Sequence, residues 1–314
     1  MNAPRAAARQ AGLSSAEVIV MAAIMSVLMI MITESMTTLT GVRSEQRAQI
    51  RLGDVTDKVA RRIEQDLGYA TRIFTDTPAD LEYLQAMDVG VDFAGPDRRL
   101  PKLTTRGFFE PDKAGAPETG NVLFLARRLP RAQLDTERLT GTMVQGYVFT
   151  VATPIDVGGQ LDLLRWNSEP VADYWDLAGI ADLAARAEVL VQLLEHGVHF
   201  AWDPSAPRSS GLFEISDAGA LVQLDADRPI PGTEERASSR PFRPRHLAIA
   251  PNTTDPPHRV PAYARQNGAF PGGFELKIDG AAAGKLVLLR IVTQSTLEAR
   301  QVSGELLRFL TTNG

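Results

Sequence analysis

The chain of 314 residues has no cysteine and no excess of basic side chains. Without cysteine it can form no disulfide, no thiolate-bound zinc or iron–sulfur site and no cysteine nucleophile. Its 33 Lys and Arg against 38 Asp and Glu give a net charge of −5, so the surface is not built to neutralise nucleic-acid phosphates. With 44% hydrophobic and 23% charged residues the composition is that of a globular protein. We therefore expect no nucleic-acid partner.

The chain also lacks the common short signatures of catalysis. It contains no G-x-S-x-G elbow, no H-E-x-x-H pair and no dinucleotide-binding glycine fingerprint. His196 and His199 lie next to Glu195, but Gly197 separates them and is expected to end a helix, so the two imidazoles are not expected to share a metal. Core or interface anchoring is the expected role of the three tryptophans, Trp166, Trp175 and Trp202. We expect the chain to have no catalytic residue, no cofactor and no metal, and therefore expect that it is not an enzyme.

Apolar residues are concentrated near the N-terminus. Residues 1–12, MNAPRAAARQAG, are small or polar and carry Arg5 and Arg9 without an acidic residue. The segment from Leu13 to Ile32 is largely apolar, and as a helix it would span about 30 Å, the thickness of the hydrocarbon core of a bilayer. Positive charges before a span favour a cytoplasmic N-terminus. The chain is expected to cross a membrane once, with the remainder outside the cytoplasm.

Three kinds of N-terminal segment fit this pattern. A cleaved secretory signal would use Val18 to Ile32 as its apolar core, but the exit TESMTTLTG offers no small-x-small cleavage site. A plain signal anchor is the second interpretation. Neither explains Glu17, a carboxylate inside the apolar segment, where an ionisable group is costly and normally has a specific partner.

The third interpretation rests on the residues from Gly12 to Val18, which read GLSSAEV between a short basic leader and the apolar stretch. They resemble the prepilin-type signal of type IV pilins and type II secretion pseudopilins. In that family a prepilin peptidase cuts after the glycine and methylates the new N-terminus, and a glutamate is fifth in the mature chain, as Glu17 is after Gly12. The chain departs from the usual pattern at Leu13, where Phe is commonest. The resemblance implies cleavage between Gly12 and Leu13 and an assembly role for Glu17, paired with the N-terminal ammonium of a neighbouring subunit.

The stretch after the span has the pattern of a long amphipathic helix. Thr33 to Ala70 contains no proline, and Asp57 precedes Arg61 by the four residues that favour an intrahelical ion pair. A continuous helix from Ser14 to Ala70 would be about 85 Å long, with glycines 41 and 53 as weak points. A coiled-coil or linker stalk is the alternative. The expected buried face repeats every three or four residues and consists of Leu52, Val55, Val59, Ile63 and Leu67.

Residues 71–314 are expected to form a mostly antiparallel β head with two further helices, which makes the fold class α+β. Hairpins are predicted over 212–224 and 274–294, and helices over 180–194 and from Ser295 to the C-terminus. Residues 229–272 hold nine of the twenty prolines and are expected to be an irregular insertion. The domain plan is therefore a leader (1–12), a transmembrane and spine helix (13–70) and an extracytoplasmic head (71–314).

These features resemble large minor subunits of the J-type pseudopilin or W-type minor pilin kind. The resemblance implies a structural subunit of the bacterial inner membrane, with a periplasmic head, that assembles through its N-terminal helix into a type IV pilus or a type II secretion pseudopilus. Implied partners are the prepilin peptidase, sibling subunits, the inner-membrane assembly platform and the lipid bilayer. The alternative from another class is an extracytoplasmic enzyme or binding protein carried on a signal anchor.

Overall fold

The chain divides into two units, residues 1–50 and residues 51–314. The first contains the N-terminal part of helix α1 (Ser15–Gly68), and the second contains the rest of that helix and the head. The computed structural model describes residues 14–85, 98–104, 119–129, 143–157, 160–205, 212–216, 218–223, 244–250, 258–259, 274–280, 285–297 and 300–311.

Helix α1 is continuous over 54 residues, as the proline-free sequence predicts. In the threonine-rich stretch in its middle, the hydroxyls of Thr33, Thr38 and Thr40 donate to the carbonyl four residues earlier, at 2.7–2.8 Å, and so find an acceptor within the helix. Gly41 and Gly53 were expected to weaken the helix, yet both lie inside it. Neither glycine interrupts the helix, because the residues on both sides of each are helical.

The larger sheet begins with the strand that follows α1. Its described strands run in the order β1-β3-β4-β6-β7-β8-β9, with β5 paired to β4 and β10 paired to β5. Every pairing is antiparallel except that of β6 with β7. The bounds are β1 (Ala70–Ile73), β3 (Leu123–Arg128), β4 (Gly146–Val157), β5 (Gln160–Ser168), β6 (Val171–Asp173), β7 (Phe200–Trp202), β8 (Leu212–Ile215), β9 (Leu221–Gln223) and β10 (Pro244–Ala250).

The smaller sheet corrects one prediction. It consists of β2 (Leu103–Thr104), β11 (His258–Arg259), β12 (Phe274–Asp279), β13 (Leu286–Leu297) and β14 (Arg300–Thr311). The helix expected from Ser295 to the C-terminus is wrong, because this segment finishes β13 and forms β14, which pairs with β13 from Leu286↔Thr311 to Leu297↔Arg300. The two predicted hairpins are confirmed as β8–β9 and β12–β13.

The proline-rich insertion also contains strands. Residues 229–272 were expected to be irregular, but β10 and β11 lie within them. Pro244 is the first residue of β10, a position where the missing N–H does not interrupt the ladder to β5. The other residues of the insertion lie outside the described part of the chain.

Three short helices lie in the described part of the head, α2 (Pro78–Gln85), α4 (Tyr174–Ala178) and α5 (Leu183–Glu195). The predicted helix over 180–194 is confirmed as α5. Asp182 caps its start by accepting the N–H of Ala184 at 3.0 Å. It ends where Gly197 adopts a φ of 75° and the N–H of Val198 reaches the carbonyl of Leu193 at 2.8 Å, a Schellman motif.

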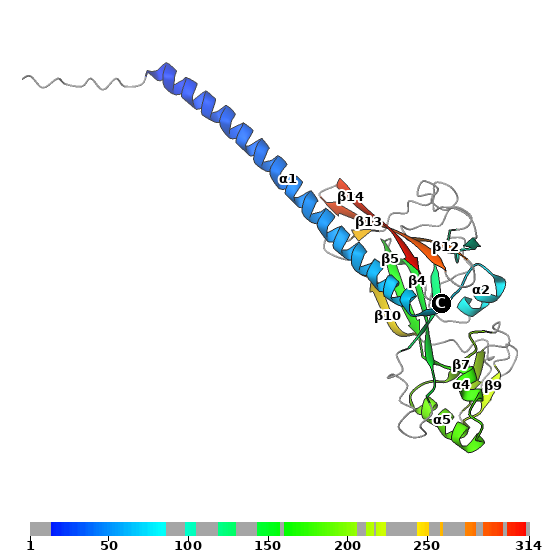
Figure 1. Ribbon diagram of the computed structural model, residues 1–314. Coiled ribbons are helices and arrows are strands. Elements are labelled where there is room, and N and C mark those ends of the chain that lie inside the picture. Colours follow the sequence, from blue (N-terminus) through cyan, green and yellow to red (C-terminus); the bar gives the residue numbers. More distant parts are fainter. Residues whose placement is uncertain are drawn as a thin grey trace, which may run out of the picture. The chain divides into compact units, whose positions relative to one another are not determined.

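Side chains of the larger sheet alternate between two buried layers. On β3, Leu123 and Leu125 join the core beneath α1, whereas Phe124 and Ala126 join a second, aromatic core. The layer beneath α1 combines one face of the helix with residues of both sheets, and Figure 1 shows β4, β5 and β10 beside the end of α1. The C-terminal part of α1 is thus an integral piece of the head. Its contributions to this layer include Ala60, Ile63 and Leu67.

Candidate functional site

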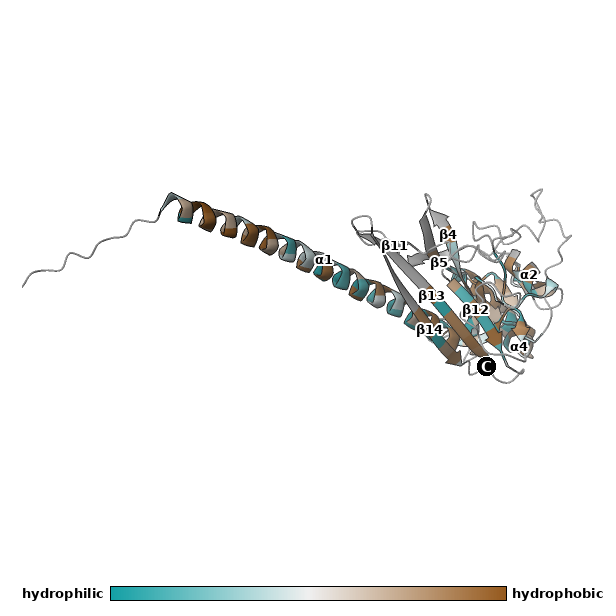
Figure 2. Cartoon of the chain, turned by 90° about the horizontal axis from the view of Figure 1, so that it is seen from above, coloured by the Kyte–Doolittle hydropathy of each residue, from teal (hydrophilic) through white to brown (hydrophobic). Residues whose placement is uncertain are grey.

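The first candidate site is the apolar N-terminal part of α1. Large apolar side chains from Val18 to Ile32 are 46% to 68% exposed, and Figure 2 shows this part of the helix as predominantly hydrophobic. By length and composition this is the helix among the described residues that could cross a membrane. So much exposed apolar surface on one helix requires an apolar solvent or apolar partners. The length and composition of the helix are consistent with a single-pass membrane anchor.

The start of α1 shows how Glu17 is held. Its carboxylate accepts the backbone N–H of Ser14 at 2.8 Å, and the Ser14 hydroxyl accepts the N–H of Glu17 at 3.3 Å. This reciprocal pair is a capping box, which satisfies two backbone donors that have no helical acceptor. The sequence signal for this bond is the S-x-x-E pattern of residues 14–17. Glu17 therefore has a local bonding role in the isolated chain.

The predicted processing residues Gly12 and Leu13 lie outside the described residues. The predicted leader, residues 1–12, lies outside them as well. Glu17 is the member of the predicted site that the structure places, in the first turn of α1.

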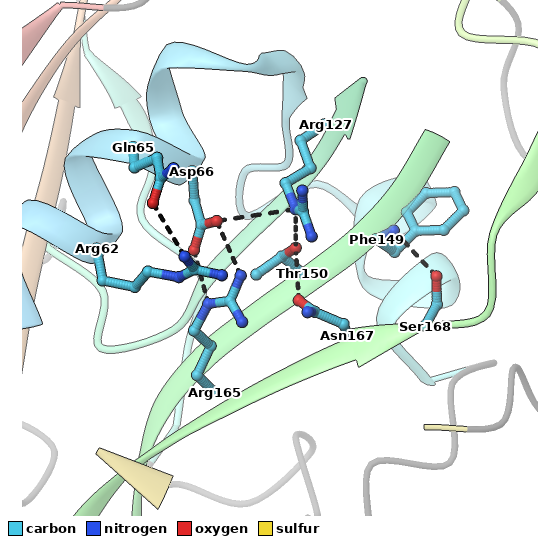
Figure 3. Close-up of polar contacts among 9 residues, drawn as sticks. All are labelled: Arg62, Gln65, Asp66, Arg127, Phe149, Thr150, Arg165, Asn167 and Ser168. Carbon is cyan, nitrogen blue, oxygen red and sulfur yellow. Dashed lines mark hydrogen bonds and ion pairs between the residues drawn. The ribbon is translucent and has the colours of Figure 1, made fainter. Parts of the chain in front are cut away.

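A second polar site, which the sequence analysis missed, joins the other end of α1 to the larger sheet (Figure 3). Asp66 accepts two hydrogen bonds from Arg165 on β5, at 2.7 Å to Nε and 2.8 Å to Nη2. Arg127 on β3 points its Nε at the same carboxylate from 3.7 Å. The side chains of Asp66, Arg165 and Arg127 are only 5%, 9% and 17% exposed. The carboxylate of Asp66 is thus the buried counter-charge of two arginines.

Strand alternation explains why these groups converge. Residues 163 and 165 on β5 face α1 while 164 and 166 face the aromatic core, and residues 123, 125 and 127 on β3 share the helix-facing side. Thr150 on β4 completes the site, since its hydroxyl lies 3.3 Å from Arg127 Nε and 3.0 Å from the side-chain amide of Asn167. With the Asn167 oxygen turned toward Arg165 Nη1 at 3.1 Å, its nitrogen can donate to Thr150. The site is a chain of hydrogen bonds from Asp66 through Arg165, Asn167 and Thr150 to Arg127, which the 3.7 Å ion pair between Arg127 and Asp66 closes.

The charged groups of this network bind one another and hold α1 against the sheet. Burial lowers the pKa of Arg127, Asp66 opposes that shift, and Arg165 and Arg62 add to it. Asp66 is thus the counter-charge that opposes the effect of burial on Arg127. A bidentate Arg–carboxylate pair fixes both partners in one orientation, so the network sets the register of α1 against β3 and β5. Its sequence signal was an acidic residue beside Ile63 and Leu67 on the helix face predicted to be buried.

A third contact ties α1 to the C-terminal strand. The predicted intrahelical pair is present, with Arg61 Nε 2.6 Å from Asp57 Oδ2. Asp57 also pairs with Arg308 on β14, whose Nη1 lies 3.2 Å from Glu64 Oε2. These side chains are partly exposed, so each pair adds little stability. Together with Leu306 and Leu310, which pack in the core beneath α1, Arg308 shows that alternate residues from 306 to 310 of β14 face the helix.

Among the described residues, no group of three His, Cys, Asp or Glu side chains is arranged to hold a metal ion. His196 follows the last residue of α5, where its Nδ1 lies 2.8 Å from the carbonyl of Gln192, and His199 lies beyond Gly197. The tryptophans separate into two buried residues, Trp166 and Trp202, and Trp175, which is 58% exposed.

Compared with family models, with curated proteins and with solved structures of known proteins, the chain matches none.

Proposed function

We propose that this chain is a minor pilin or minor pseudopilin, a structural subunit that assembles through its N-terminal helix into a type IV pilus or a type II secretion pseudopilus. The observation that carries the proposal is one continuous helix with two different surfaces. Its first part exposes apolar side chains on all sides, and its last part is buried in a β-rich head. Such a subunit can be stored in a membrane and transferred into a bundle of similar helices without refolding its head.

The N-terminal residues support the same function through their resemblance to a prepilin signal. Prepilin peptidase would cut between Gly12 and Leu13, and methylation would follow at the Leu13 amine. Glu17 would then lie four residues from a new positive charge. The N-terminus would begin in the cytoplasm and the head would lie in the periplasm, where the assembly platform and sibling subunits would receive it.

Mass spectrometry of the mature N-terminus is the decisive test of processing. Protein purified from membranes of a host with a prepilin peptidase should begin at Leu13 and carry a methyl group on its amine. Deletion of the peptidase should leave residues 1–12 attached. An intact Met1 in the presence of the peptidase would favour the plain signal anchor, and a mature end elsewhere would favour a secretory signal.

The assembly role of Glu17 needs a test that separates charge from helix capping. Glutamine can also accept the Ser14 N–H, so Glu17→Gln removes the charge and keeps the capping box, whereas Glu17→Ala removes both. Ser14→Ala weakens the cap and keeps the charge. If Glu17 pairs with a neighbour's ammonium, both Glu17 variants should insert in the membrane and fold but be depleted from sheared fibres, and Ser14→Ala should be recovered normally.

Two other outcomes would contradict this role. Normal recovery of Glu17→Gln together with loss of Glu17→Ala would show that the cap is what assembly requires. Equal recovery of all three variants with the unmodified protein would show that neither is required.

The alternative of an anchored enzyme is tested on the same purified protein. A structural subunit should copurify with sibling subunits from sheared fibres and contain no stoichiometric cofactor. Turnover of a substrate by the full chain, with no association with fibres, would support the enzyme.

A further inference from the structure

The head contains a hollow between α4, α5 and the β8–β9 hairpin, with a volume of about 400 Å³. This volume lies in the range of pockets that bind small ligands or inserted side chains. One wall is a stacked pair, Tyr174 and Phe213, whose ring centroids are 4.0 Å apart at an angle of 12°. The facing wall belongs to α5 and includes Leu183, Arg186 and Leu190.

The walls of this hollow are preformed by close packing. Gly219 in the hairpin turn has a φ of 70°, and a Cβ at that position would lie 3.5 Å from the carbonyl oxygen of Ala187 and 3.4 Å from a methyl group of Val191. The hairpin therefore rests directly on α5. Below it, Leu190 and Leu193 are buried against the strands, which holds the helix in place. A ligand would meet a fixed surface and lose little entropy in ordering it.

Arg186 is the charged side chain in the lining of this hollow. Its backbone N–H bonds to the carbonyl of Asp182 in the first turn of α5. Within the described part of the chain its guanidinium has no hydrogen-bond or ion-pair partner. The nearby carboxylate of Asp182 is used to cap the helix through the N–H of Ala184. An arginine at an apolar wall has the geometry to receive a carboxylate through two parallel hydrogen bonds.

Exposed apolar side chains extend the surface beyond the hollow. Trp175 is 58% exposed with its ring 5.2 Å from that of Tyr174, Leu183 is 68% exposed, and Val191, beside Gly219, is 44% exposed. Of the seven large apolar side chains that are exposed among the described residues of 51–314, these three lie around one pocket. An apolar rim with a central pocket is the arrangement of a protein-binding hot spot.

We propose that this hollow binds a peptide segment of another protein. The segment inserts one aromatic or branched aliphatic side chain between Tyr174 and Leu190 and pairs an adjacent Asp or Glu with Arg186. A polypeptide fits better than a small molecule because the rim continues past the hollow, and a small ligand would leave Trp175 and Val191 uncovered. The site is separate from the assembly function proposed for α1 and does not depend on it.

The tryptophans make this binding measurable in the full chain in detergent. Trp166 and Trp202 are 0% exposed, so acrylamide should quench mainly Trp175. The probes are acetylated, amidated hexapeptides of Gly and Ser in which one Phe or Leu lies one, two or three positions from one Asp. At least one member should shield Trp175 saturably, and matched peptides with Asn for Asp, or Ala for Phe or Leu, should bind at least about tenfold more weakly.

Two variants test whether the peptides bind at Arg186. Arg186→Gln should reduce the affinity of the best Asp peptide by about tenfold and leave that of its Asn counterpart unchanged. Lys102→Gln removes an exposed positive charge elsewhere in the head and should change neither. Circular dichroism and melting temperature should be the same for both variants as for the unmodified protein.

Each remaining outcome would overturn the proposal. Absence of shielding by every peptide would show that no such segment binds. Equal affinity of Asp and Asn peptides, or unchanged binding by Arg186→Gln, would show that no carboxylate of the peptide pairs with Arg186. Shielding by phenylacetate as strong as that by the best peptide would assign the hollow to small anions.

Discussion

Helix α1 carries apolar side chains at both ends, but they are exposed in the N-terminal region and buried in the C-terminal region. From Val18 to Ile32 the large apolar side chains are exposed on every face, whereas Leu52, Ile63 and Leu67 near the other end are at most 2% exposed. The second region also carries charge on its outward face and a carboxylate on its buried face. One continuous backbone thus first presents an apolar surface long enough to span a membrane and then contributes one face to a protein core.

The largest effect is expected when the buried charge of the second region is removed. Asp66→Ala would leave Arg165 and Arg127 buried without their carboxylate, which costs about 3–5 kcal/mol of unfolding free energy. Urea unfolding of the full chain in detergent, followed by near-ultraviolet circular dichroism, measures the loss.

Asp54→Ala is the matched control, because Asp54 is an exposed acidic residue on the same helix. It should shift the urea midpoint by far less than Asp66→Ala. Replacing Asp66 with Leu and both arginines with Met should recover much of the stability, since an apolar cluster of similar volume needs no charge balance. If Asp54→Ala and Asp66→Ala had equal midpoints, the network would not hold the helix.

A charge in the first region should act on membrane insertion and not on the head. Met25→Arg places a guanidinium in the middle of the apolar run and should cost about 2.5–3.5 kcal/mol for insertion. The expected result is a larger fraction extracted from membranes by carbonate, with the head still folded.

Thr38→Arg adds the same charge beyond the apolar run and should be retained in the membrane like the unmodified protein. Unchanged retention of Met25→Arg would contradict the assignment of this region as a transmembrane span.

A buried polar pair away from α1 serves as a comparison for the loss of stability expected in Asp66→Ala. The Tyr147 hydroxyl donates to Asp173 at 2.8 Å, and Tyr147 belongs to the aromatic core on the other side of the sheet. Tyr147→Phe should cost about 1–2 kcal/mol, because one oxygen of Asp173 loses its donor. Unfolding in urea should show a smaller loss than Asp66→Ala, with the contacts of α1 unchanged.

The pH dependence of this pair has a definite sign. Burial, the hydrogen bond to Asp173 and the charge of Asp173 raise the pKa of Tyr147 above its usual 10.0. The folded protein keeps this proton where the unfolded chain releases it, so the stabilisation is present below about pH 10 and declines as the pH rises further. Alkaline unfolding should be steeper in the unmodified protein than in Tyr147→Phe, and equal slopes would contradict the shift.

The smallest effect is a gain in stability where the second region begins. Gly53 lies inside α1, and a Cβ there would have no heavy atom within 4 Å. Gly53→Ala should therefore stabilise the helix by about 0.5–1 kcal/mol, since alanine loses less backbone freedom than glycine. Thermal unfolding of the full chain measures it. A lower melting temperature would contradict the open space around position 53.

The comparison of sequence and structure is clearest at the C-terminus. Leu306 and Leu310 are four residues apart, a spacing that fits one face of a helix and also one face of a strand. In β14 they and Arg308 face α1, while Phe309 is exposed. Pairing with β13 over twelve residues decided between the two structures, and no local window of sequence contains that partner.

The candidate sites divide in the same way. Glu17 was found from the sequence because an acid within an apolar run is conspicuous, and its capping bond with Ser14 was also readable three residues away. Asp66 was visible only as an acidic residue on a buried helix face. Its partner Arg165 is 99 residues away, so the sequence could suggest that a cation was needed but could not say which one.

The sequence by itself determined the apolar span, the continuous helix with its buried face, the helix α5 and the two hairpins, because each depends on periodicity and caps within a few residues. Only the tertiary structure decided the ion network around Asp66, the strand β14 and the hollow beside Arg186. These depend on strand register and on which faces meet across long stretches of chain, and such contacts form only when distant segments pack together.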